Sequence, residues 1–93
     1  MIIGVMEMQL SMPANRSLKD KRRVLRSVKD RARAGFNVAI AEVADHDKWC
    51  SAHLAAVTVA PDRERAHEVL EGVARSMERR GDAILADYCI QML

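Results

Sequence analysis

The spacing of apolar residues along this chain switches repeatedly between two periods, and that switching limits the folds it can adopt. In the first segment, apolar and polar residues alternate, with Met6, Met8, Leu10 and Met12 pointing to one side. Alternation is typical of a strand with one buried face, whereas a spacing of three and four residues is typical of an amphipathic helix. By these criteria we predict strands over residues 2–12, 36–43, 52–60 and 83–93, and helices over 17–34 and 62–80.

The predicted helices carry recognisable boundary residues. Ser17 is placed as an N-cap, and Asp20 three residues later completes a weak capping box. Gly35 is placed to end the first helix, because glycine readily takes the conformation that follows a helix. Asp62 is the expected N-cap of the second helix, and Gly81 is expected to close it.

The resulting order, β-α-β-β-α-β, predicts an α+β fold of the ferredoxin-like kind. Right-handed crossovers place both helices on one face of a four-stranded antiparallel sheet. The chain has 93 residues, 49% of them apolar, which suits a single domain over residues 1–93.

Two cysteines, Cys50 and Cys89, are too few for a disulfide framework, and we expect both to be buried. The apolar run over residues 1–5 is too short for a signal peptide, and no stretch approaches the ~20 apolar residues of a membrane span. These features predict a cytoplasmic protein without membrane contact.

Positive charge is concentrated in one part of the chain. Nine of the 15 lysines and arginines lie within residues 16–33, opposed only by Asp20 and Asp30. That segment carries a net charge of +7 while the remaining residues carry −5, so the formal net charge of +2 hides strong polarity. A local cationic field of this kind is typical of a surface that binds polyanions, because neutralised phosphates release counterions.

The buried stripe of the first helix is expected at Leu18, Leu25, Val28 and Ala32, with Val24 beside it. The basic residues of the first helix are then exposed to solvent, although like charges three and four residues apart destabilise a helix. The alternatives are a face that only aids solubility, or one that pairs with glutamates of the second helix. We predict phosphate contacts from Arg16, Lys19, Arg22, Arg23, Arg26, Lys29 and Arg33.

RNA is favoured over DNA as the polyanion. A basic helix tied to a sheet by its apolar stripe cannot project deeply into a major groove, whereas RNA is often recognised by shape and backbone. The strands predicted over residues 2–12 and 52–60 offer no aromatic side chain on which a base could stack, so the contact should come from the helix.

Several segments resemble the YlxP-like family of bacterial domains of unknown function. They are MIIGVMEMQLSMP, RSLKDKRRVLRSVKDR, FNVAIAEV and the pattern formed by Asp47, Trp49, Ala52 and Leu54. The resemblance covers essentially the whole chain and implies a small cytoplasmic ferredoxin-like protein, often encoded near translation initiation and ribosome maturation factors. It therefore points to ribosomal RNA or the small ribosomal subunit as partner. It supplies no catalytic residues. The matching positions are Ser17, Leu18, Lys19, Lys21, Arg22, Arg23, Phe36, Asn37 and Glu42.

The sheet face away from the helices is predicted to be too apolar to remain in water, which favours a homodimer through that face. We expect it to carry Ile3, Val5, Ala39, Ala41, Val43, Ala55, Val57, Val59, Leu85 and Leu93. Trp49 is expected to cover the open end of the core; the alternative is an exposed anchor for a partner. The main rival to RNA binding is a pure protein-interaction or assembly module, whose basic helix docks on an acidic protein.

Two chemical constellations are weighed and disfavoured. His46, Cys50 and His53 have a spacing that resembles a zinc site, but no second ligand pair follows, so no metal or cofactor is expected. Arg16 and Asn37 occupy roughly the positions that acylphosphatases of this fold use. The turn over residues 12–15 has no glycine and loses a donor at Pro13, so a phosphate cradle is not favoured. We therefore expect a protein that is not an enzyme.

Overall fold

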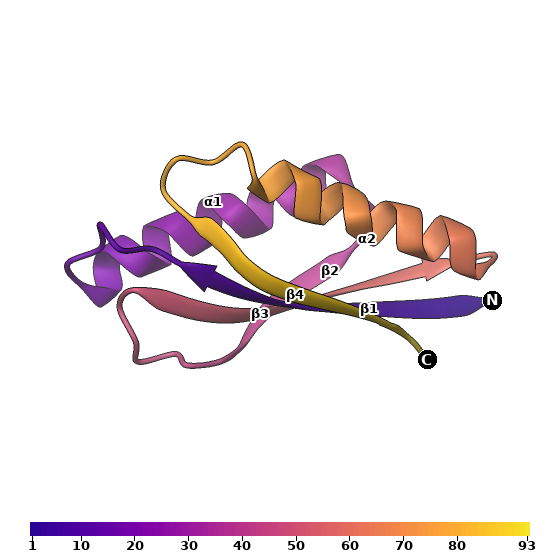
Figure 1. The fold of residues 1–93 in the computed structure, drawn as a ribbon, viewed down its shortest axis with the longest axis horizontal. Helices are drawn as coiled ribbons and strands as arrows, with labels where there is room; N and C mark the ends of the chain where they lie inside the picture. Colours follow the sequence, from indigo (N-terminus) through magenta and orange to yellow (C-terminus); the bar gives the residue numbers. More distant parts are fainter.

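A computed structural model describes residues 1–93 as a four-stranded antiparallel sheet with both helices over one face (Figure 1). The order β-α-β-β-α-β and the sheet confirm the predicted ferredoxin-like α+β fold. The elements are β1 (Ile2–Ser11), α1 (Leu18–Gly35), β2 (Ala39–Ala44), β3 (Ser51–Ala60), α2 (Arg63–Met77) and β4 (Ile84–Met92).

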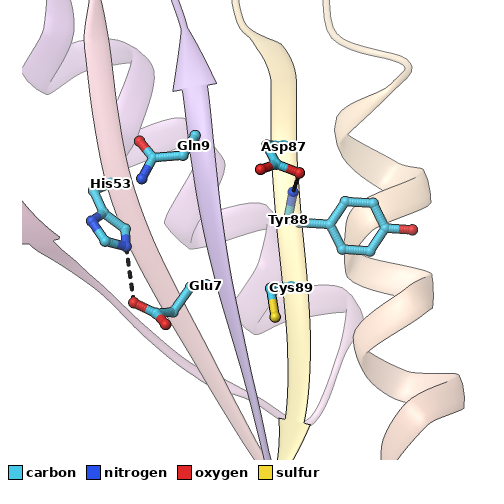
Figure 2. A pocket seen from close by; sticks show the side chains of 6 residues that line it. All are labelled: Glu7, Gln9, His53, Asp87, Tyr88 and Cys89. Atoms are coloured by element: carbon cyan, nitrogen blue, oxygen red, sulfur yellow. Dashed lines mark hydrogen bonds and ion pairs between the residues drawn. The ribbon is translucent and has the colours of Figure 1, made fainter.

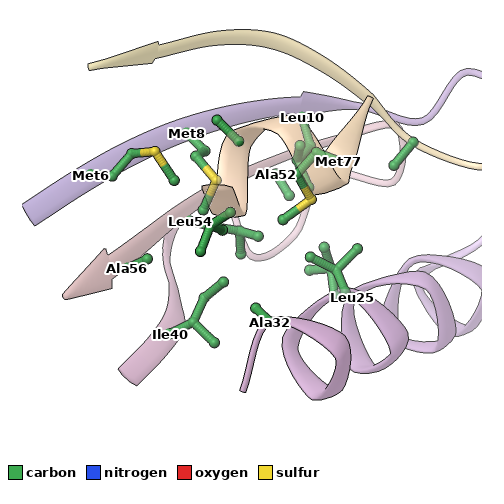
Figure 3. Close-up of a cluster of buried hydrophobic side chains, with 14 of the residues drawn as sticks. Met6, Met8, Leu10, Leu25, Ala32, Ile40, Ala52, Leu54, Ala56 and Met77 are labelled. Carbon is green, nitrogen blue, oxygen red and sulfur yellow. The ribbon is translucent and has the colours of Figure 1, made fainter. Parts of the chain in front are cut away.

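The strands lie in the order β2-β3-β1-β4, so β1 and β3 are central and β2 and β4 form the edges. Met6 of β1 lies opposite Ala56 of β3 and Ile90 of β4, and all three point toward the helices. Even-numbered residues of β1 and β3 therefore fill the core, as the alternation predicts (Figure 3). Helix α2 lies over β1, β3 and β4, whereas α1 lies mainly beside β2.

Both predicted N-caps are confirmed. The Ser17 hydroxyl accepts from the Asp20 backbone N–H at 3.1 Å, and the Asp62 carboxylate accepts from the Arg65 N–H at 2.8 Å. Helix α1 ends at Gly35, but α2 ends at Met77 and leaves Gly81 in the loop. The predicted end of α2 is wrong because the hydrogen bonds after Met77 span three residues and not four. The Arg80 N–H, for example, donates to the Met77 carbonyl, and such bonds end the α-helix early.

Two strand predictions need correction. Strand β2 begins at Ala39, because Phe36 is the C-cap of α1 and bonds back to that helix. The pairing of β4 with β1 shifts between Gln9 and Leu10, and the bulge turns Leu85 toward the helices. Leu85 thus joins the core instead of the open sheet face, and Ile84 takes the outward position.

A close approach between Gly72 and Phe36 fixes α2 against the end of α1. A Cβ atom added at Gly72 would lie 2.6 Å from Cε1 of the Phe36 ring. The ring therefore occupies the space that any side chain at position 72 would need. Glycine at position 72 thus lets α2 approach Phe36, the residue that follows α1, closely.

Neither cysteine is buried, contrary to expectation: both thiols are free and exposed. Cys50 lies in the loop between β2 and β3, and Cys89 points outward from the edge strand β4. Neither α1 nor α2 combines the length and the apolar character that crossing a membrane requires.

Candidate nucleic-acid interface

Helix α1 separates its charged and apolar residues onto opposite sides. The side toward the sheet buries Val24, Leu25, Val28 and Ala32, while Leu18 is only half-buried. The other side carries a cationic stripe at a spacing of three and four residues. We define this stripe as Lys19, Arg22, Arg26, Lys29 and Arg33; four of its members are exposed and Lys29 is half-buried.

The stripe borders a shallow groove. A hollow of about 220 Å³ lies between α1 and β2, with Glu42 the one β2 residue on its wall. Most of the wall comes from α1, and it is strongly cationic. The α1 residues that line it are Arg22, Leu25, Arg26, Lys29, Asp30 and Arg33.

Most of the predicted phosphate contacts have no anionic partner within the chain. Arg23 pairs with Asp20 at 2.7 Å. Arg33 lies 3.9 Å from Asp30 and donates to the Ile40 carbonyl of edge strand β2 at 3.0 Å. The remaining five make no ion pair: Arg16, Lys19, Arg22, Arg26 and Lys29.

The glutamates of α2 do not neutralise this surface. Glu68 pairs with Arg65 on its own helix, and Glu71 contacts His67 and the Tyr88 hydroxyl. No ion pair joins the two helices. The positive charge of α1 therefore remains available to a partner.

The first turn of α1 keeps one carboxylate ionised. The Arg16 backbone N–H donates to Asp20 at 2.9 Å and, helped by the Arg23 guanidinium, lowers the pKa of the Asp20 carboxyl. A carboxylate at a helix N-terminus also interacts favourably with the helix dipole. Asp20 thus stabilises the start of α1, and Arg23 is the only neighbouring cation with which it forms an ion pair.

Lys21 lies inside the basic segment yet is not available to a partner. Its side chain is buried, with the residue only 1% exposed, and its Nζ lies 2.8 Å from Glu42 Oε2. The same ammonium donates to the Asp45 carbonyl at 2.7 Å. The expectation that every basic neighbour on this helix faces solvent is wrong for Lys21. Its position, four residues before Leu25 and seven before Val28, places it on the buried side.

The chain matches, over residues 3–90, a family described as a protein of unknown function, DUF503. The chain belongs to this family. No curated protein matches it. The description of the DUF503 family assigns no activity, so the chemistry of this domain must be argued from its own residues.

Trp49 is 53% exposed, so the expectation that it covers the core is wrong. It lies in the loop between β2 and β3, next to the loop that leads into α1. Asn15 donates to the Trp49 carbonyl at 3.0 Å, and the Met12 N–H donates to the Cys50 carbonyl at 2.8 Å. The predicted core contact fails because these bonds tie down the backbone of the loop while the indole stays outside.

The residues of the zinc-like spacing do not converge. His46 contacts the Glu42 carbonyl, the Cys50 thiol donates to the Asn15 carbonyl, and His53 pairs with Glu7 at 3.0 Å. No three side chains of the DUF503 domain are grouped so that they could hold a metal ion.

Arg16 and Asn37 are likewise held apart. They flank the two ends of α1, an 18-residue helix about 27 Å long at 1.5 Å per residue. The Asn37 carbonyl accepts from the Thr58 hydroxyl at 2.7 Å. The two side chains cannot share one phosphate group, so the acylphosphatase-like arrangement is not formed.

The open sheet face of the domain is apolar at one end and polar at the other. Of the predicted interface residues, Ile3, Val5 and Val57 are half-buried, and the others are exposed: Ala39, Ala41, Val43, Val59 and Trp49. Val43 occupies an irregularity in the β2–β3 pairing, and Trp49 lies in the loop outside the sheet.

The polar end forms a hollow that the sequence reasoning missed. Figure 2 shows Glu7, Gln9, Asp87 and Cys89 beside His53, while the Tyr88 ring turns away toward α2. Alternation with Met6, Met8 and Leu10 puts Glu7 and Gln9 on this face, but the residues beside them depend on the register of β3 and β4 against β1. His53 and Glu7 pair diagonally across β1 and β3 at 3.0 Å.

Proposed function

We propose that this DUF503 domain is a non-enzymatic RNA- or ribosome-associated binding domain whose helix α1 contacts phosphates. The observation that carries the proposal is the set of five cations, Arg16, Lys19, Arg22, Arg26 and Lys29, that have no anionic partner in the chain. Unpaired like charges on one helix disfavour folding by a few tenths of a kcal/mol per pair, which a bound polyanion offsets.

The geometry of α1 favours a backbone contact over groove reading. From Lys19 to Arg33 the stripe runs about 21 Å at 1.5 Å per residue. That length corresponds to roughly six nucleotides of one strand at 3.4 Å each. Because its apolar side is buried against the sheet, α1 meets RNA along its exposed flank only. Ribosomal RNA or the small ribosomal subunit, in the cytoplasm, is the partner that the YlxP-like resemblance favours.

The proposal predicts a definite salt dependence. If all five unpaired cations neutralise phosphates, the slope of log affinity against log salt is roughly −3.5 for single-stranded RNA. Affinity then falls on the order of 100-fold between 50 and 200 mM salt. Binding that does not respond to salt contradicts phosphate contacts as its source.

The decisive experiment compares two variants with the same change in net charge. Arg22→Glu/Arg26→Glu/Lys29→Glu reverses the stripe, and Arg63→Glu/Arg65→Glu/Arg75→Glu reverses three exposed arginines of α2. Fluorescence anisotropy of ribosomal RNA fragments, and cosedimentation with small subunits, should show lost binding in the first variant and retained binding in the second. Circular dichroism confirms that both are folded. Equal loss in both would show that net charge alone governs binding, and no binding by the wild type would refute the proposal.

A second candidate is an assembly module in which the open sheet face covers a second copy of this chain. Val59 is 53% exposed on that face, and none of the four strands contains a lysine or arginine. Lysine is depleted in the cores of interfaces. Four strands of 10, 6, 10 and 9 residues give this face a flat area of roughly 550 Å², below but comparable with the ~800 Å² per partner of a standard interface.

The dimer is tested by sedimentation velocity across a range of protein concentrations. Val59→Lys should shift the wild-type dimer to monomer, whereas Ala34→Lys on the exposed side of α1 should not. The shift should be insensitive to salt, unlike RNA binding. A wild type that sediments as a monomer at every concentration rules out this candidate.

A further inference from the structure

Trp49 is an exposed aromatic residue that lies outside the hydrophobic core cluster. The chain has three aromatic residues, and the other two are engaged: Phe36 packs on the core beside Gly72, and the Tyr88 hydroxyl donates to Glu71. The polar contact of Trp49 goes through its backbone carbonyl, which leaves its indole without a polar partner in the chain.

The loop that carries Trp49 is held on both sides of that residue. Before it, the buried Lys21 ammonium binds the Asp45 carbonyl at 2.7 Å, and Lys48 pairs with Asp45 at 3.3 Å. After it, the Cys50 carbonyl accepts from the Met12 N–H at 2.8 Å. The Cys50 thiol also donates to the Asn15 carbonyl at 3.4 Å.

These contacts join the loop to the β1–α1 connection and to α1 itself. The indole is therefore presented on a fixed backbone, which lowers the entropy lost when a partner binds it.

The nearest part of the cationic surface begins beside this loop. Asn15, which holds the Trp49 carbonyl, directly precedes Arg16 in the chain. Lys19 follows in the first turn of α1, and neither Arg16 nor Lys19 has an anionic partner. Figure 1 shows the start of α1 and the β2–β3 loop at the same end of the molecule. An aromatic surface thus lies beside the start of a row of unpaired cations.

We propose that Trp49 stacks on an unpaired nucleobase of the RNA whose phosphates lie along α1. This inference rests on the proposed function and adds to it a class of substrate, single-stranded RNA or a loop with a splayed base. A single-stranded chain offers both parts at once: a base face for the indole and a flanking phosphate for Arg16 or Lys19. A continuous duplex offers phosphates but keeps its bases stacked on each other, so it can contact the cations of α1 but not the Trp49 indole.

The single tryptophan makes the stacking directly measurable, because all indole fluorescence of this protein comes from Trp49. The probes are a labelled oligoadenylate of about 12 nucleotides and an RNA duplex of matched length, titrated at low salt. Anisotropy reports binding to either probe, and indole emission reports contact with a base. We expect quenching with the single strand and little quenching with the duplex.

Three variants separate stacking from other effects. Trp49→Leu should weaken single-strand binding by roughly 5- to 150-fold and leave duplex binding unchanged, whereas Trp49→Phe should retain most of the affinity. Tyr88→Leu removes the other exposed ring and should bind as the wild type does. Because Trp49 is outside the core, thermal unfolding of Trp49→Leu should match that of the wild type.

The outcomes distinguish this inference from the function on which it rests. Anisotropy that rises while indole emission stays constant, with Trp49→Leu binding as the wild type does, overturns the stacking and leaves the phosphate contacts of α1 standing. An equal loss in Trp49→Leu and Tyr88→Leu overturns it as well. No anisotropy change with either probe or with ribosomal RNA overturns both proposals together.

Discussion

The ammonium of Lys21 and the carboxylate of Glu42 lie 2.8 Å apart and join α1 to β2 across the buried side of the sheet. The side chain of Lys21 is 2% exposed and that of Glu42 is 18% exposed. A charge so far removed from water is tolerated only with a close partner. This pair therefore fixes the position of α1 along the edge strand, and with it the position of the cationic stripe.

Removing one partner of this pair should destabilise the fold strongly. Glu42→Ala leaves the Lys21 ammonium with only the Asp45 carbonyl, and we expect it to lower the free energy of unfolding by about 3 kcal/mol. The double variant Lys21→Met/Glu42→Leu should recover most of that loss, because two apolar side chains leave no charge buried. Urea denaturation of the wild type, Lys21→Met, Glu42→Leu and the double variant measures the coupling between the two residues. Additive losses would show that the two residues do not act as a pair.

Gly72→Ala should destabilise the protein although alanine favours helices. The new methyl group would meet the Phe36 ring, an overpacking that costs about 1–3 kcal/mol against a gain of about 1 kcal/mol in helix propensity. Phe36→Leu should relieve part of the clash in the double variant. Gly35→Ala is the matched control, since nothing lies within 4 Å of its added Cβ atom, and it should raise the melting temperature. A Gly72→Ala melting temperature above that of the wild type would refute the predicted clash.

Acid should reduce stability partly through Asp20 and Asp82. Hydrogen bonds from the Arg16 N–H to Asp20, and from the Arg80 guanidinium to Asp82, lower the pKa of each carboxyl below its ordinary value of 3.8. A pKa that is lower in the folded state stabilises the fold above the unfolded value and stops doing so as the pH falls through the folded value. Asp20→Asn/Asp82→Asn should therefore be less stable than the wild type near neutral pH and approach it below pH 3.8. Thermal unfolding from about pH 6 to pH 2 tests this, and a constant difference across that range would contradict it.

Both thiols should react while the protein is folded. Cys50 and Cys89 are exposed and free, so Ellman's reagent should titrate two thiols without denaturant. Cys50→Ser and Cys89→Ser should each leave one reactive thiol. Reaction that requires urea would show that a larger assembly buries these cysteines, and Cys89 on the open sheet face would be the one to examine first.

The order of the elements and both N-caps could be predicted because they depend on local chemistry. Apolar and polar residues alternate over residues 2–12 because that strand has one face exposed to solvent. Ser17 and Asp62 accept hydrogen bonds from backbone N–H groups only three residues away. The exposed side of α1 also follows from helical spacing. Its cations lack partners in the structure because the glutamates of α2 bond to residues on their own side of the fold.

The remaining features depend on contacts between residues far apart in the chain. The bulge that moves Leu85 inward arises from pairing with β1, and no local pattern near Leu85 announces it. Trp49 is exposed because Asn15, 34 residues earlier, holds its carbonyl. Lys21 is different, since its spacing from Leu25 and Val28 and the inward position of Glu42 were visible in the sequence. A lysine on the buried side of α1 and a glutamate on the buried side of β2 together indicated an ion pair.

The absence of lysine and arginine from all four strands has a consequence for how the molecule meets its partners. Every lysine and arginine lies in a helix or a loop, and the cations of α1 that lack an anionic partner concentrate positive charge on one side of the domain. Under the proposed function, a polyanion attracts this side of the molecule and turns α1 toward itself before contact is made. The bare sheet then points outward from the complex. If both proposals hold, one domain binds a nucleic acid on its helical side and a protein on its strand side at the same time, as a bridge between them.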